Sequence, residues 1–194
     1  MGTRSSMRLS DLIIAGDPKS FDVIRSPEIV QPLPDDVDPE GILYDMYPAE
    51  CDESKGEDAC VLFKYDESAT GVDLVHTPHL QSLSVHLSPW ASEADVLLYV
   101  DFVNALLRKH KRARLYDKYA HLKCLTDEDA ARMIKDRRAY LKRQLTTKDS
   151  FTMEGLNADF TLKVAHLCPA VSPDIQALEL QRQFVSMQWD FPDA

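Results

Sequence analysis

Two amphipathic segments, residues 92–108 and 126–145, constrain the fold of this 194-residue chain more than any other feature of its sequence. Each segment begins with a hydroxyl residue, Ser92 or Thr126, that is followed by acidic residues in the next turn. A hydroxyl group can accept a free backbone N–H at a helix start, and carboxylates there lie at the positive end of the helix dipole. The sequence therefore predicts two capped helices.

Both segments carry apolar residues at spacings of three and four, which is typical of a helix with one buried face. In the first segment this face comprises Val96, Val100, Val103 and Leu107, widened by Leu97 and Leu106, with Asp101, Asn104 and Arg108 on the opposite side. In the second it comprises Ala130, Met133, Ile134, Tyr140, Leu141 and Leu145, while the residues expected to point away are Arg132, Lys135, Arg138, Lys142 and Arg143.

Alternating apolar and polar residues indicate half-buried strands elsewhere in the chain. The clearest candidates are residues 60–65, 72–76, 81–87, 159–167 and 185–191, and weaker ones are 7–15, 21–24, 41–46 and 112–116. A short helix is expected over 173–180, after the start signal Ser172-Pro173-Asp174. Strands grouped before the helices favour an α+β fold, with a mainly antiparallel sheet and two long amphipathic helices packed on one face. We expect residues 59–194 to form the α+β core and residues 1–58 an acidic, loop-rich part of the same domain.

The composition is that of a globular domain, with 44% hydrophobic residues. No apolar run approaches the ~20 residues that a membrane span requires, and the first residues lack the apolar stretch of a signal peptide. A soluble cytoplasmic protein is the resulting expectation. The four cysteines include no Cys-x-x-Cys pair, so reduced thiols are expected rather than a zinc site.

The charge of the chain is unevenly distributed. Residues 108–148 hold 14 of the 22 lysines and arginines but only 5 of the 32 acidic residues, although the net charge of the whole chain is −10. This basic stretch has three possible interpretations: a solvated helix face, a docking patch for an acidic protein partner, or a site for a phosphate-bearing ligand. The residues proposed for binding are Arg108, Lys111, Arg112, Arg114, Tyr116, Arg138, Lys142 and Arg143.

His76, His79 and His86 form the densest group of potential metal ligands, with Asp73 as a possible fourth. Paired strands could bring these imidazoles together around a divalent ion. The group lacks a recognisable ligand spacing, however, so surface histidines are the simpler interpretation and no metal is expected.

The chain contains no nucleophile elbow, no glycine-rich phosphate loop and no other catalytic fingerprint, and no cofactor is expected. We expect a cytoplasmic, non-enzymatic interaction or regulatory protein that binds another protein through charge-complementary faces. The first alternative is a ligand- or nucleic-acid-binding module that uses the basic stretch 108–148, although the net negative charge argues against nucleic acid. The second is a metal-dependent hydrolase built on the three histidines. The sequence leaves the oligomeric state open.

Overall fold

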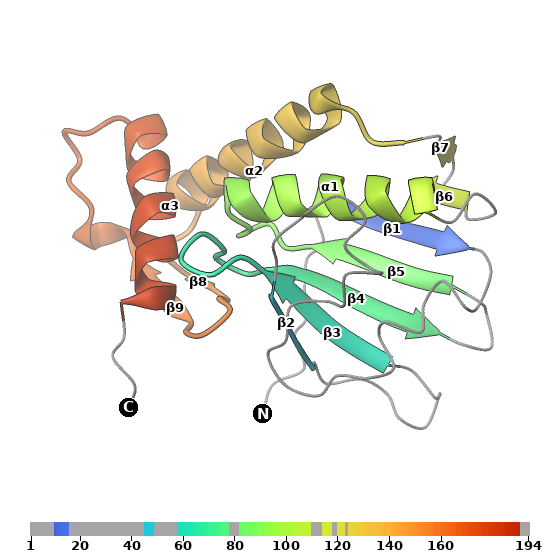
Figure 1. Ribbon diagram of the computed structural model, residues 1–194. Helices are drawn as coiled ribbons and strands as arrows, with labels where there is room; N and C mark the ends of the chain where they lie inside the picture. The colour runs from blue at the N-terminus through green and yellow to red at the C-terminus, as the bar shows by residue number, and fades with distance from the viewer. Residues whose placement is uncertain are drawn as a thin grey trace.

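The computed structural model describes residues 10–15, 45–48, 58–77, 82–109, 114–117, 120–122 and 124–190. Within them, a seven-stranded sheet and a separate two-stranded hairpin combine with three long helices (Figure 1). All neighbouring strands are antiparallel. The predicted α+β class with a mainly antiparallel sheet is confirmed, but the described residues contain three long helices rather than two. The strand expected at 21–24 lies outside the described residues.

The large sheet has the strand order β2-β3-β4-β5-β1-β6-β7. Strand β1, the first of the described strands along the chain, lies inside the sheet and pairs with β5 on one side and with β6 on the other. Strand β2 forms one edge of the sheet and, among the described strands, pairs only with β3. The bounds are β1 (Ser10–Ala15), β2 (Asp45–Pro48), β3 (Asp58–Phe63), β4 (Val72–Thr77), β5 (Ser82–Leu87), β6 (Arg114–Asp117) and β7 (Ala120–Leu122).

The first helix, α1 (Glu93–Lys109), lies across one face of this sheet (Figure 1). Its predicted apolar face is largely confirmed, because Val96, Val100, Val103 and Leu106 are buried in one cluster with side chains of β3, β4 and β5. Leu97 is an exception because it is 48% exposed, whereas Leu98, Tyr99 and Phe102, which the prediction left out, are buried. Successive helix positions differ by about 100°, which turns Leu97 away from the sheet that Val96 contacts.

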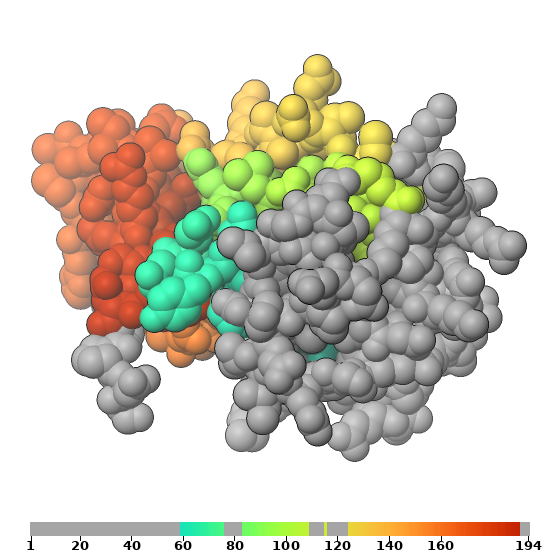
Figure 2. Space-filling view, in the orientation of Figure 1, coloured from blue at the N-terminus to red at the C-terminus, as the bar shows by residue number. Residues whose placement is uncertain are grey.

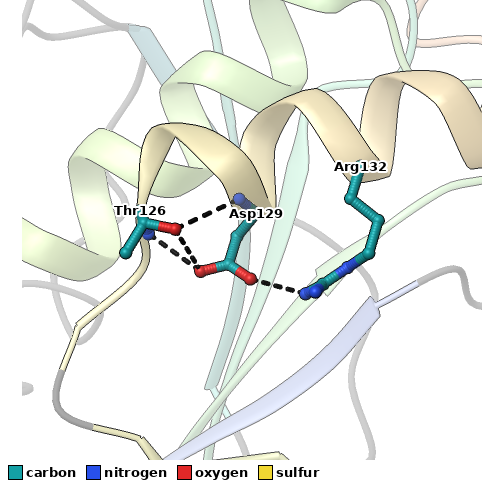
Figure 3. Close-up of polar contacts among 3 residues, drawn as sticks. All are labelled: Thr126, Asp129 and Arg132. Carbon is teal, nitrogen blue, oxygen red and sulfur yellow. Dashed lines mark hydrogen bonds and ion pairs between the residues drawn. The ribbon is translucent and has the colours of Figure 1, made fainter.

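The second helix, α2 (Asp127–Thr147), begins with the capping arrangement that the sequence predicts (Figure 3). The Thr126 hydroxyl accepts the Asp129 backbone N–H at 3.2 Å, and the Asp129 carboxylate accepts the Thr126 backbone N–H at 2.9 Å. The same carboxylate receives a hydrogen bond from Arg132 one turn later, at 2.5 Å. The two bonds between Thr126 and Asp129 satisfy backbone donors that a helix start otherwise leaves free.

Two hydrophobic clusters divide α2 between them. Ala130 and Met133 join the cluster formed by the sheet and α1, whereas Leu141 and Leu145 belong to a second cluster. That second cluster also contains side chains from the hairpin and from the third helix. Its elements are β8 (Ser150–Met153), β9 (Phe160–Lys163) and α3 (Pro173–Trp189), with the 3-10 turn η4 (Val164–His166) after β9. The single long helix α2 therefore connects both cores.

The end of the described chain corrects the sequence analysis. The short helix predicted over 173–180 continues to Trp189, and the strand predicted over 185–191 does not form in its described part. Buried side chains recur at Ala177, Leu180, Phe184 and Gln188, which is a helical spacing. Because Gln188 is polar, a search for apolar residues at helical spacing does not identify this whole face. Val185, Met187 and Trp189 also alternate with polar residues, which is the pattern of a strand.

Candidate functional site

The predicted basic face is only partly brought together by the fold. Arg138, Lys142 and Arg143 follow one another on the outer part of α2, and Arg108 is exposed near the end of α1. Arg114 and Tyr116 lie in β6. Lys111 and Arg112 lie outside the described residues.

The three basic residues of α2 that were predicted to bind, Arg138, Lys142 and Arg143, have partners within the chain. Arg138 forms an ion pair with Glu93 at the start of α1, and Lys142 Nζ lies 2.8 Å from the Asp174 carboxylate at the start of α3. The Arg143 guanidinium lies over the Tyr140 ring, 5.4 Å from its centroid. All three basic side chains border solvent, where such contacts contribute roughly 0–1 kcal/mol. The two ion pairs link α2 to α1 and α3, and all three contacts are weak enough to be replaced by contacts with an external partner.

The two described histidines of the predicted metal group, His76 and His86, are not opposite each other in the sheet. In the pairing of β4 with β5, His86 is opposite Asp73, whereas His76 is opposite Leu83. The two histidine positions are thus offset by three residues, or about 10 Å along the strands. His79 lies outside the described residues. Within the part of the chain that is described, no group of three or more His, Cys, Asp or Glu residues is arranged to hold a metal ion.

The turn between β3 and β4 is hydrogen-bonded to α1, to α3 and to the loop between β8 and β9. Asp95 of α1 is fully buried, and its carboxylate accepts the backbone N–H groups of Ala69, Thr70 and Gly71 at 3.0–3.2 Å. It also accepts the Ser92 N–H at 2.7 Å, while the Ser92 hydroxyl accepts the Asp95 N–H. A capping box at the start of α1 therefore also fixes the turn.

Gly71 is required in this turn. Its φ of +68° lies in the left-handed region that favours glycine. A Cβ atom at this position would lie 2.5 Å from Val61 Cγ1 and 2.6 Å from the Leu62 carbonyl oxygen, closer than packed atoms approach. The backbone can present three consecutive N–H groups to Asp95 only because a side chain is absent here.

The same turn anchors the third helix. Trp189 of α3 donates its indole N–H to the Ser68 carbonyl at 2.8 Å, and its ring lies 4.8 Å from the Tyr65 ring. The Leu156 N–H, from the loop between β8 and β9, donates to the Ala69 carbonyl at 2.8 Å. In Figure 2 the segment around the turn (teal) lies directly against α3 (red). Both α3 and the loop of the β8–β9 hairpin are thus hydrogen-bonded to the turn that connects β3 with β4.

A groove of about 740 Å³ opens beside this junction. Its walls come from the turn, from residues 90–94 at the start of α1, from the middle of α2 and from the face of α3 between Leu178 and Asp190. The volume is within the range of about 300–1,000 Å³ that is usual for ligand sites. Trp90 and Trp189 both line it, and Trp90 is held in place by its stacking on Phe151.

The groove carries charges of both signs. Acidic residues lining it are Asp66, Glu67, Glu93 and Asp190, and the basic residues are Arg137, Arg138 and Arg182. Arg137 differs from the other two because it is only 2% exposed, whereas Arg138 and Arg182 border solvent. Burial lowers the pKa of the Arg137 guanidinium to about 10, against the opposing attraction of Asp95 and Glu93. Arg137 therefore remains a cation at neutral pH.

The sequence analysis did not single out Arg137, and the structure shows that it is buried. A usable signal was present, because Arg137 follows Met133 by four positions and precedes Leu141 by four, on the apolar stripe of α2. The importance of Asp95 beyond its own helix had no local signal, since its partners in the turn lie 24 to 26 residues earlier.

The chain matches no protein-family model, no curated protein and no solved structure. Of the helices in the described residues, none is both long and apolar enough to cross a membrane.

Proposed function

We propose that this chain is a non-enzymatic binding protein that holds a segment of another protein in the groove beside the β3–β4 turn. The observation that supports the proposal is the combination of two positioned tryptophan rings with charged residues of both signs. Tryptophan, tyrosine and arginine are the residues that most often dominate the energy of protein–protein interfaces. Charges of both signs then select a partner by electrostatic complementarity.

A protein segment suits this groove better than a nucleic acid. Four carboxylates line the groove and would repel a phosphate backbone, which binds where basic residues are concentrated. A peptide, in contrast, can present apolar, acidic and basic side chains to the matching parts of the wall. Arg138 belongs both to the groove and to the basic face predicted from the sequence, so Lys142 and Arg143 would lie at the rim and steer the partner's approach.

A comparison of two double variants tests the proposal. Leu178→Ser with Arg182→Gln alters exposed groove residues, and Ile175→Ser with Lys135→Gln makes matched changes at exposed positions that do not line the groove. Each tagged protein is used for affinity capture from a nuclease-treated extract, followed by quantitative mass spectrometry. We expect proteins captured by the unmodified chain to be retained by the control variant and depleted by the groove variant.

Retention of every captured protein by the groove variant would contradict the proposal. A third variant, Lys142→Gln with Arg143→Gln, separates the groove from the outer face of α2. If this variant alone loses the partner, the basic face predicted from the sequence is the interface and the groove is not. If partners are captured from an untreated extract but not from the nuclease-treated one, the ligand is a nucleic acid and the proposal is wrong.

A further inference from the structure

Arg137 occupies an unusual position for a charged residue. It lies among the buried residues of α2, between Met133 and Leu141, and only 2% of its surface is exposed. Among the residues that the structure describes, its Nε and Nη1 atoms have no hydrogen-bond partner. A guanidinium carries five N–H donors and is normally buried only when these are used.

Neither nearby carboxylate meets this need. Asp95 and Glu93 are close enough to attract the Arg137 charge. The Asp95 carboxylate, however, already accepts four backbone N–H groups from the turn and the helix start. Glu93 is paired with Arg138 on the solvent side. Arg137 is therefore held in a favourable potential, but its buried Nε and Nη1 atoms remain unpaired beside the groove that Arg137 helps to line.

An incoming carboxylate is the chemical group that this arrangement fits. Hydrogen bonds between a guanidinium and a carboxylate are about twice as strong as those between neutral groups, and arginine can make two of them at once. A buried site strengthens them further because little water competes. A ligand with one carboxylate would use the free donors, whereas a polyanion would meet the four acidic residues of the same groove.

The other residues of the groove wall indicate which kind of residue would flank that carboxylate in the ligand. Leu178, Val185 and the two tryptophans provide apolar surface around the groove. An acidic residue that is flanked by apolar residues in a peptide would place its side chain toward Arg137 and its neighbours on these walls.

We propose that Arg137 recognises an aspartate or glutamate side chain that lies between apolar residues in the partner's segment. This inference rests on the function proposed above, and it specifies the chemistry that the groove selects. Arg137 acts as the carboxylate-binding residue, while Asp95 positions the turn and the helix start around it.

Intrinsic fluorescence provides a local readout, because the only two tryptophans of the chain, Trp90 and Trp189, both line the groove. The probes are two tripeptides blocked at both ends, one with the sequence leucine-glutamate-leucine and one with glutamine in the middle. Blocked ends remove the terminal carboxylate, so any preference for the first peptide reports on the acidic side chain. The Arg137 Nε–H resonance is followed by NMR in the same titrations.

We expect the glutamate peptide to bind at least about tenfold more tightly than the glutamine peptide, and to shift the Arg137 Nε–H resonance. In the Arg137→Gln variant the two peptides should bind equally, whereas Lys135→Gln, at an exposed position of α2 that does not line the groove, should keep the preference. If Arg137→Gln fails to fold, the comparison of the two peptides on the unmodified chain still decides the question.

Equal affinity of the two peptides for the unmodified chain would overturn the role of Arg137 while leaving the groove proposal in place. Absence of any response to either peptide at about 10 mM would overturn it as well, since such weakness excludes a useful contribution to affinity. Loss of the preference in Arg182→Gln but not in Arg137→Gln would assign carboxylate recognition to the exposed arginine instead.

Discussion

The Asp95 carboxylate in α1 accepts a hydrogen bond from the backbone N–H of Gly71, 24 residues earlier in the chain, at 3.2 Å. The same carboxylate accepts the N–H groups of Ala69 and Thr70, so it takes the place of water as the acceptor for three backbone donors of a buried turn. Buried backbone donors are costly when unpaired, so this one side chain makes the burial of the turn possible.

The first prediction follows from this contact. Asp95→Asn replaces one acceptor oxygen with an amino group that faces backbone donors, so at least one buried N–H loses its partner. We expect the free energy of unfolding to fall by about 2–4 kcal/mol in urea melts. Asp101→Asn, at an exposed position of the same helix, is the matched control and should change it by no more than roughly 0.5 kcal/mol. Similar values for the two variants would contradict the role assigned to Asp95.

A second prediction tests which face of α1 is buried. Leu106 is 6% exposed and Leu97 is 48% exposed, so one substitution can be compared at two positions of the same helix. Leu106→Ala should lower the free energy of unfolding by about 2–4 kcal/mol, through lost burial and a residual cavity. Leu97→Ala should lower it by less than about 1 kcal/mol. The reverse order in denaturant melts would show that the wrong face of α1 has been placed against the sheet.

The third prediction concerns the stability effect of Arg137. Because Nε and Nη1 of Arg137 are unpaired and the Asp95 carboxylate accepts backbone N–H groups, Arg137→Met should leave the free energy of unfolding unchanged or raise it by up to about 2 kcal/mol. Arg138→Met, at an exposed position, should change it by roughly 0.5 kcal/mol or less. A loss of more than about 2 kcal/mol in Arg137→Met would make Arg137 a structural counter-ion rather than a residue maintained for binding.

The fourth prediction is a pH dependence at the start of α2. Hydrogen bonds from the Thr126 backbone N–H and hydroxyl, with a smaller contribution from Arg132, lower the pKa of Asp129. The unfolded chain has an aspartate pKa of about 3.9, so this stabilisation is complete well above that pH and is lost as the pH falls through the lower folded value. Asp129→Asn should lower the free energy of unfolding by about 0.5–1 kcal/mol at neutral pH, and the difference should shrink in acid. A difference that stays constant down to about pH 2.5 would contradict it.

The fifth prediction concerns thiol reactivity. Burial, with a further contribution from Asp73, raises the pKa of the Cys60 thiol to about 12, so it stays protonated at neutral and mildly alkaline pH. Cys124 and Cys168 are exposed. A thiol reagent at pH 8 should modify these two in the folded protein, and Cys60 only after denaturation, because the thiolate is the reactive form. Peptide mapping by mass spectrometry distinguishes the sites, and rapid labelling of Cys60 in the folded chain would show that its strand is not buried.

The sequence was sufficient wherever the deciding contacts are local. Both helix starts follow from residues three positions apart, as in Thr126 with Asp129 and Ser92 with Asp95. Most of the buried residues of α1 and α2 follow from the helical repeat, with the exposed Leu97 and the buried Tyr99 and Arg137 among the exceptions. These interactions occur within one or two turns of a helix, so the order of residues alone specifies them.

Tertiary structure decided the length of α3 and the location of the groove. From Val185 to Trp189 the chain satisfies both a strand pattern and a helix pattern, and the choice depends on what each face contacts. Gln188 is buried because its side chain accepts the Asn157 and Ala158 N–H groups and donates to the Ala158 carbonyl. Those partners lie about 30 residues earlier, so no local pattern could identify this polar residue as part of the buried face.

The candidate site depends even more on distant parts of the chain. Its walls come from a turn near residue 66, a helix start near residue 92, the middle of α2 and the end of α3. The sequence determined that Arg137 would be charged and would occupy the same face of a helix as Met133 and Leu141. Only the packing of α1 and α3 against α2 buried that charge beside Asp95, because burial depends on which surfaces meet and not on the residues that neighbour it in the chain.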